Sequence, residues 1–152
     1  MDSDRDVVER QLGRPPRAFR RVVVRCPFGQ PAVTEQAAYD DAGEPFPTTF
    51  WLTCPHLVAA VSRVEAAGGV ERWTRSAAEE PALQRSVERA HAEQRRLRPE
   101  LDVGIGGARA GAGSLKCLHA HVAFALARPG YELGSRVVEE LEPLWPDVCC
   151  SG

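Results

Sequence analysis

The stretch "FPTTFWLTCPHLVAAVSRVEAAGG", residues 46–69, changes its hydrophobic pattern near its middle, and this change decides the fold class. Its first part, residues 46–54, is rich in β-branched and aromatic residues and predicts a strand. From Pro55, which suits a first helical turn, the apolar residues recur at helical spacing, at Leu57, Val58, Val61 and Val64. The pattern therefore predicts a sheet before this point and helices after it, which is an α+β fold.

The residues before this stretch supply the rest of the predicted sheet. The segment "AFRRVVVRC", residues 18–26, contains three consecutive valines and predicts a strand, and "AVTEQAAY", residues 32–39, is a weaker strand candidate. Turn residues separate the three segments at "CPFGQP", residues 26–31, and at "DDAGEP", residues 40–45. We therefore expect a small antiparallel sheet of about three strands in the N-terminal half of the chain.

Helices precede and follow this sheet. A short helix over residues 4–12, capped by Ser3 or Asp4, is expected to form an N-terminal helix and linker over residues 1–16. Further helices are predicted over residues 55–67, 81–97, 115–127 and 133–144, and the glycine-rich residues 102–114 predict a loop. We expect a single domain, 1–152, with four or five helices against the sheet and a mobile tail over 146–152.

The composition gives no indication of nucleic-acid binding or of a membrane span, and it predicts where in the cell the protein is located. Of the 152 residues 43% are hydrophobic and 26% charged, which is typical of globular proteins, and the net charge of -2 gives no nucleic-acid signal. No apolar run approaches the ~20 residues that span a bilayer, and the start "MDSDRDVVERQLG" lacks the apolar core of a signal peptide. We therefore expect a cytoplasmic protein whose five cysteines are reduced.

Residues that carry chemistry gather in "GSLKCLHAHVAFALA", residues 113–127, which also contains the only lysine of the chain, Lys116. Cys117 and His121 are four positions apart, so a helix that includes both places them on one face and His119 elsewhere. The spacing predicts that Cys117 and His121 act together. Apolar residues occupy nearly the whole circumference of this helix, which predicts that it is buried.

A metal site is the leading interpretation of the cysteines. Cys26 ends the first predicted strand and Cys54 ends the third, so the two thiols lie at one end of the sheet if these strands are neighbours. The predicted ligands are Cys26, Cys54, Cys117 and His121, with His56 and His119 as supporting or substitute ligands. Such a Cys3His set suits zinc or an iron–sulfur cluster. Ordinary buried cysteines and core histidines are the alternative, because free cysteine is among the most buried residue types.

A thiol-dependent enzyme is a second interpretation of the same stretch. Cys117 would be the nucleophile, with His119 or His121 as the base. Arg109, Lys116 and the N–H groups that follow the glycine-rich loop would hold a phosphate or carboxylate of a small substrate. A flexible connector is the simpler explanation of the glycines, and no acidic residue within this stretch is placed to orient a histidine.

Five motifs occur along the chain in the order "CPFGQP", "DDAGEPFPTTFWLTCPHL", "SRVEAAGG", "GIGG" and "KCLHAHVAFALA". Together they closely resemble the bacterial domain-of-unknown-function family 501, found mainly in actinobacteria, over about residues 22–126. The resemblance implies a small cytoplasmic bacterial protein and implies no particular activity. It places Cys26, Cys54, Cys117, His119 and His121 inside the motif pattern of the family, and Cys149 and Cys150 outside it.

A third hypothesis concerns a protein partner. Members of the resembled family often lie in the genome near septum-formation-initiator-like and exopolyphosphatase-like proteins. The segment from Arg14 to Arg25 contains five arginines and no acidic residue. The genomic association of the family implies an interaction protein of cell division or the cell envelope, which would use this basic face, although a solvated strand and loop surface explains the same arginines.

Overall fold

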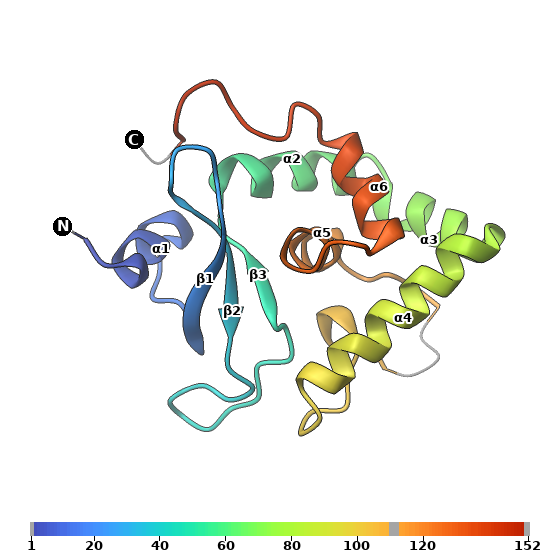
Figure 1. Cartoon of the computed structure of the whole chain (residues 1–152), viewed down its shortest axis with the longest axis horizontal. Coiled ribbons are helices and arrows are strands. Elements are labelled where there is room, and N and C mark those ends of the chain that lie inside the picture. The colour runs from blue at the N-terminus through green and yellow to red at the C-terminus, as the bar shows by residue number, and fades with distance from the viewer. Residues whose placement is uncertain (1, 110–112, 151–152) are drawn as a thin grey trace.

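The computed structural model describes residues 2–109 and 113–150 (Figure 1). Its sheet consists of β1 (Phe19–Arg25), β2 (Pro31–Gln36) and β3 (Phe50–Leu52) in the order β1-β2-β3. Both strand pairs are antiparallel. Because β2 is the central strand, it separates β1 from β3. The predicted sheet is therefore confirmed, but its first and third strands are not neighbours.

Six α-helices accompany the sheet in the described part of the chain, and they confirm the α+β class. They are α1 (Asp4–Leu12), α2 (Pro55–Ala66), α3 (Gly69–Glu79), α4 (Pro81–Leu97), α5 (Leu118–Ala127) and α6 (Glu132–Glu140). A 3-10 turn, η1 (Ile105–Gly107), lies within the glycine-rich segment, of which residues 110–112 lie outside the described part. No helix over the described residues is both long enough and apolar enough to cross a membrane.

Three element boundaries differ from the sequence predictions for local reasons. Gly68, at φ 85°, ends α2, and α3 begins at the next residue, whereas the sequence suggested only a helix stop there. The strand β3 is limited to Phe50–Leu52, because Pro47 cannot donate a ladder hydrogen bond. The last helix ends at Glu140 instead of residue 144, since Pro143 is incompatible with a helix interior.

Helix α5 is the centre of the fold and lies between the sheet and helices α4 and α6 (Figure 1). It packs against β3 on one side and against α6 and α2 on others. Seven of its ten residues are buried, which confirms the prediction of a central buried helix. The ring of Phe124 packs edge-on against Phe50 of β3, with ring centroids 5.7 Å apart. The residues at the start of α5 are therefore held in place by packing on several sides.

Close packing between α5 and α6 depends on Gly134. A Cβ atom at this position would lie 2.6 Å from the Cβ of Ala125 and 2.7 Å from the ring of Tyr131. We expect Gly134→Ala to lower the free energy of unfolding by about 1–3 kcal/mol, despite the higher helix propensity of alanine. Urea denaturation monitored by circular dichroism measures this change. An unchanged or increased stability would show that α6 can move away from α5 at little cost.

Candidate functional site

A tight turn places Cys117 immediately before α5. The Cys117 N–H donates to the carbonyl of Leu115 at 2.8 Å, and Lys116 between them has a φ of 66°. Left-handed backbone is uncommon for a residue with a side chain, and such positions concentrate at functional sites. The helix consequently begins at Leu118, and Cys117 is extended, with φ −143°. The predicted helix from residue 115 is therefore wrong in its first turn.

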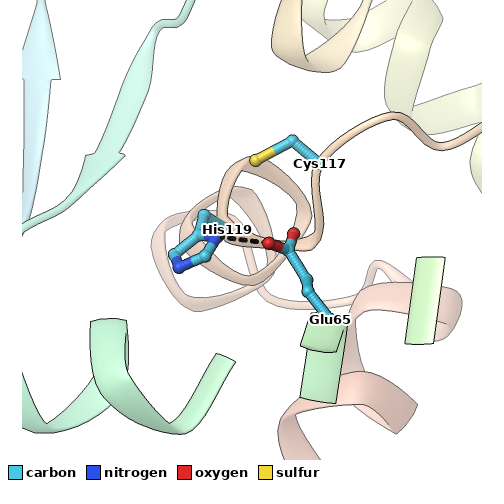
Figure 2. Close-up of side chains that lie close together, drawn as sticks. All are labelled: Glu65, Cys117 and His119. Carbon is cyan, nitrogen blue, oxygen red and sulfur yellow. Dashed lines mark ion pairs between the residues drawn. The ribbon is translucent and has the colours of Figure 1, made fainter. Parts of the chain in front are cut away.

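Three side chains converge at this point, and they come from two separate elements. Glu65 belongs to α2, Cys117 precedes α5 and His119 lies in its first turn (Figure 2). One potential ligand atom from each lies within 4.8 Å of the other two, and no second group of this kind occurs in residues 2–109 and 113–150. A thiol sulfur, an imidazole nitrogen and a carboxylate oxygen at this separation can hold a metal ion.

Hydrogen bonds fix the orientation of the His119 ring. Its Nε2 lies 3.2 Å from the carbonyl oxygen of Val58 and 3.2 Å from the hydroxyl of Ser62, both on α2. A carbonyl oxygen only accepts, so Nε2 carries the proton that it donates. Nδ1 then faces the carboxylate of Glu65, at 3.3 Å from its Oε1. The arrangement assigns Nδ1 as the nitrogen that bears the lone pair in the neutral ring.

Glu65 is oriented by the helix that it approaches. Its Oε2 accepts a hydrogen bond from the N–H of Leu118 at 2.7 Å, so the carboxylate satisfies an N–H at the start of α5. The positive end of the helix dipole stabilises this negative charge. Sequence reasoning missed Glu65, because one glutamate within "SRVEAAGG" has the pattern of an ordinary solvated helix position. Only the packing of α2 against α5 reveals its role.

The cluster places three electron-pair donors around one point. Burial alone would raise the pKa of Cys117, but the interaction with His119 and the Ala120 N–H outweigh it, and the pKa falls below its ordinary value. The interaction with Cys117 is the main reason that the pKa of His119 is raised, with the charge of Glu65 adding to it, while burial opposes the rise. The lowered pKa of Cys117 and the raised pKa of His119 have one cause, because a positive charge between these groups is favoured. A proton or a metal ion can supply this charge.

Cys117 and His119 also border a pocket of about 490 Å³. Most of its other walls are apolar and come from Leu12, Phe50, Trp51, Leu52 and Val58. Arg14 contributes a cationic side chain to the lining. The cluster is therefore reachable from a hollow large enough for a small molecule, as is usual for ligand sites.

His121 does not join this cluster, which corrects the prediction that it acts with Cys117. Its side chain is fully buried, with Nδ1 2.7 Å from the hydroxyl of Tyr131 and Nε2 3.1 Å from the carbonyl of Leu115. Burial, with a smaller contribution from nearby His91, lowers the pKa of His121 to about 4. The prediction failed because it assumed a helix through Cys117. His121 is a satisfied core histidine.

The predicted Cys3His set is not assembled among the described residues. Cys26 lies in the turn between β1 and β2, and β2 separates it from the end of β3 that leads to Cys54. Cys54 is buried at the start of α2, with its sulfur 3.7 Å from that of Cys150. His56, the predicted substitute ligand, lies with Nε2 3.4 Å from the carbonyl of Pro143. The cysteine and histidine that the structure brings together are Cys117 and His119.

The two predicted anion-binding residues occupy different places. Arg109 lines a pocket of about 420 Å³ beside His91 and Arg95, and Lys116 is not among its lining residues. The N–H of Leu118 at the start of α5 is already bonded to Glu65. The negative group at this helix N-terminus is therefore one of the protein's own side chains. Binding of an external phosphate or carboxylate stays a prediction.

The basic segment from Arg14 to Arg25 is largely neutralised by neighbouring acids. The contacts are Arg17 with Asp40 at 2.7 Å, Arg25 with Asp4 at 2.7 Å, and both Arg20 and Arg21 with Glu35 at 3.8 and 3.3 Å. Exposed ion pairs of this kind contribute little to stability, but they compensate the charge. Arg14 instead lines the pocket beside Cys117. A protein partner for this face stays a prediction.

Comparison with known proteins places this chain in a family. A family model described as "Protein of unknown function (DUF501)" matches residues 22–102, which include the last part of β1, strands β2 and β3, and helices α2 to α4. The match covers Glu65 and ends before Cys117 and His119, so the last two motifs of the resemblance lie beyond it. No curated protein and no solved structure matches the chain. Because the model covers more than half of its residues, the chain belongs to the DUF501 family.

Proposed function

We propose that Glu65, Cys117 and His119 bind a zinc ion. The observation that carries this proposal is the convergence of their three donor atoms within 4.8 Å. The surroundings support it, because protein ligands of zinc are usually held by further hydrogen bonds. His119 is held through Nε2 by Val58, and Glu65 is held through Oε2 by Leu118. Both side chains thus keep a donor atom directed at the shared point.

The donor types favour zinc over an iron–sulfur cluster. Zinc accepts sulfur, nitrogen and oxygen ligands in one site, whereas iron–sulfur clusters are held chiefly by several thiolates. Cys117 is the one cysteine in this cluster of three. A mixed set of thiolate, imidazole and carboxylate therefore fits zinc, and the iron–sulfur alternative loses the cysteines on which it depends.

Three protein ligands beside a pocket resemble a catalytic zinc site more than a structural one. Structural zinc is enclosed by four protein ligands, whereas catalytic zinc keeps one position for water or substrate. Zinc held in this way lowers the pKa of a bound water and polarises carbonyl or phosphoryl oxygens. The pocket of about 490 Å³ borders Cys117 and His119 and would admit a substrate. We therefore propose that the protein is a metal-binding module in the reducing cytoplasm, with a zinc site of the kind found in hydrolytic enzymes.

Metal analysis of the protein purified without chelators or a histidine tag tests this proposal. We expect about one zinc per chain by elemental analysis, and one-site binding when metal-stripped protein is titrated with zinc. A chelator should remove the metal without unfolding the chain, because the packing of α5 against β3, α2 and α6 does not require a metal. Protein that retains no zinc and binds none on titration would exclude the proposal.

A second candidate function uses the same residues without a metal. The lowered pKa of Cys117 and raised pKa of His119 describe a thiolate beside a protonated imidazole, which is the pairing of a cysteine nucleophile and its acid–base partner. Glu65 would then stabilise the imidazolium. Alkylation by iodoacetamide separates the two candidates. Zinc binding predicts that Cys117 is protected until the metal is removed, whereas the nucleophile predicts fast labelling that zinc chelation does not change.

A further inference from the structure

Two cysteines that the proposed zinc site does not use lie against each other. The sulfur atoms of Cys54 and Cys150 are 3.7 Å apart, although the residues are separated by 96 positions in the sequence. Cys54 precedes α2 and is 2% exposed, while Cys150 lies in the C-terminal segment and is exposed. The resemblance to the family left Cys149 and Cys150 outside its motif pattern. The structure gives Cys150 a specific neighbour.

The C-terminal segment reaches Cys54 along a defined course. After α6 it runs along α2 towards the start of that helix (Figure 1). The carbonyl of Pro143 lies 3.4 Å from Nε2 of His56, two residues beyond Cys54. This contact is on the same end of α2 as the sulfur pair. Two separate contacts therefore place the segment at the first turn of α2.

We propose that Cys54 and Cys150 form a reversible disulfide. The proposal does not depend on the zinc site. A disulfide has sulfur atoms about 2.05 Å apart, so the pair must approach by roughly 1.6 Å from its separation in the thiol form. Disulfides in reducing compartments are usually transient or redox-sensing, and this one joins an accessible thiol to a buried thiol.

The oxidant that we assign is a low-molecular-weight disulfide, such as oxidised glutathione. The Cys150 thiolate attacks one sulfur of this disulfide, and one small thiolate leaves with the bonding electron pair. Cys54 then gives up its proton and attacks the Cys150 sulfur, which releases the second small thiolate. The two protons lost by the cysteines protonate the two released thiolates. In total two protein thiols are oxidised to one disulfide, and one small disulfide is reduced to two thiols.

The order of attack follows from exposure. Burial raises the pKa of Cys54 to about 11, so this residue forms little thiolate on its own at neutral pH. Cys150 is exposed and meets the small disulfide first. The bond would tie the C-terminal segment to α2, the helix that carries Val58, Ser62 and Glu65 around His119. Oxidation would therefore tether an element that supports the candidate site.

Peptide mapping of the purified protein tests this disulfide. The chain is treated with oxidised glutathione, alkylated and digested without reduction. Trypsin alone leaves Cys26 and Cys54 on one peptide, residues 26–63, so chymotrypsin is added to cut after Phe50 or Trp51 between them. We expect a linked pair of peptides that contain Cys54 and Cys150. Mixed disulfides on Cys150 that never resolve, or a link to Cys26 in place of Cys54, would overturn the proposal.

Matched serine variants identify the partner, since Cys149 and Cys150 share a peptide. Cys149→Ser should keep the link and Cys150→Ser should abolish it. Both residues lie in the C-terminal segment, so loss of folding does not confuse the comparison. Oxidised protein should also melt several degrees higher than reduced protein, because the bond closes a loop of 96 positions. Equal linkage in both variants, or linkage only between two chains, would contradict the proposal.

Discussion

Replacing His121 with alanine lowers the free energy of unfolding by about 3–4 kcal/mol. The change removes a ring that is fully buried, and buried aromatic side chains typically cost this much when truncated. It also leaves the Tyr131 hydroxyl and the Leu115 carbonyl without their hydrogen-bond partner. Urea denaturation of the wild-type and variant chains at pH 7.5 measures the difference.

Two control variants test why His121→Ala is destabilising: one removes a hydrogen bond alone, and the other removes a histidine that is less buried. Tyr131→Phe removes only the hydroxyl and should cost about 1–2 kcal/mol, because one hydrogen bond is lost without a cavity. His119→Ala removes a half-buried ring at the candidate site and should cost less than His121→Ala. If the two histidine variants were equally stable, His121 would not be the core residue that we describe.

The pH dependence of stability provides an independent check on His121. Its pKa is about 4 in the folded protein and about 6.5 when unfolded, so the unfolded chain binds the proton more readily. The contribution of neutral, buried His121 to the free energy of unfolding is therefore complete above about pH 6.5. This contribution is lost as the pH falls towards 4, by about 3 kcal/mol in total. His121→Gln cannot titrate, and its stability should fall less steeply over this window. If the free energy of unfolding fell equally steeply with pH in the wild type and in His121→Gln, His121 would not be the buried neutral histidine that we describe.

Loss of either Cys117 or His119 weakens zinc binding by at least about 100-fold. Each substitution removes one of three protein ligands, and even changes to groups that support metal ligands commonly cost 10- to 100-fold in affinity. Cys117→Ser and His119→Ala are compared with Cys54→Ser and Cys26→Ser by competition against a zinc-binding dye. The last two should bind zinc within about twofold of the wild type, because neither sulfur belongs to the cluster.

Glu65→Gln isolates the part of Glu65 that concerns the metal. The glutamine oxygen can still accept the hydrogen bond from the Leu118 N–H, so the start of α5 stays satisfied. The negative charge beside His119 is lost. Zinc affinity should fall while the free energy of unfolding of the metal-free protein changes by less than about 1 kcal/mol. A large loss of stability with unchanged zinc affinity would make Glu65 a helix cap only.

Regular elements were predictable from this sequence because their patterns are local. The valine-rich β1, the change of period at Pro55 and the bounds of α4 follow from side-chain types alone. Helix α3 was missed, because Gly68 and Gly69 indicate a stop and nothing in the local pattern indicates that a new helix starts at once. The short β3 and the early end of α6 both follow from prolines that override the surrounding residues.

The candidate site was only partly predictable, because it depends on contacts between distant residues. The sequence identified Cys117 and His119 as candidates, but its helical geometry paired Cys117 with His121. The left-handed Lys116 reverses that pairing, and no sequence pattern indicates a positive φ at a lysine. Glu65 lies more than 50 positions from Cys117 and reaches it only because α2 packs against α5. Such tertiary contacts are not encoded in periodicity.

Cobalt spectroscopy tests the central claim, a metal bound by Cys117, His119 and Glu65, most directly. Cobalt(II) takes the ligand geometry of zinc and has a near-ultraviolet charge-transfer band only when a thiolate is bound to it. We predict that one equivalent of cobalt gives this band in the wild type and in Cys54→Ser, that zinc displaces it, and that Cys117→Ser abolishes it. A band that survives in Cys117→Ser, or the absence of any band in the wild type, would contradict the account.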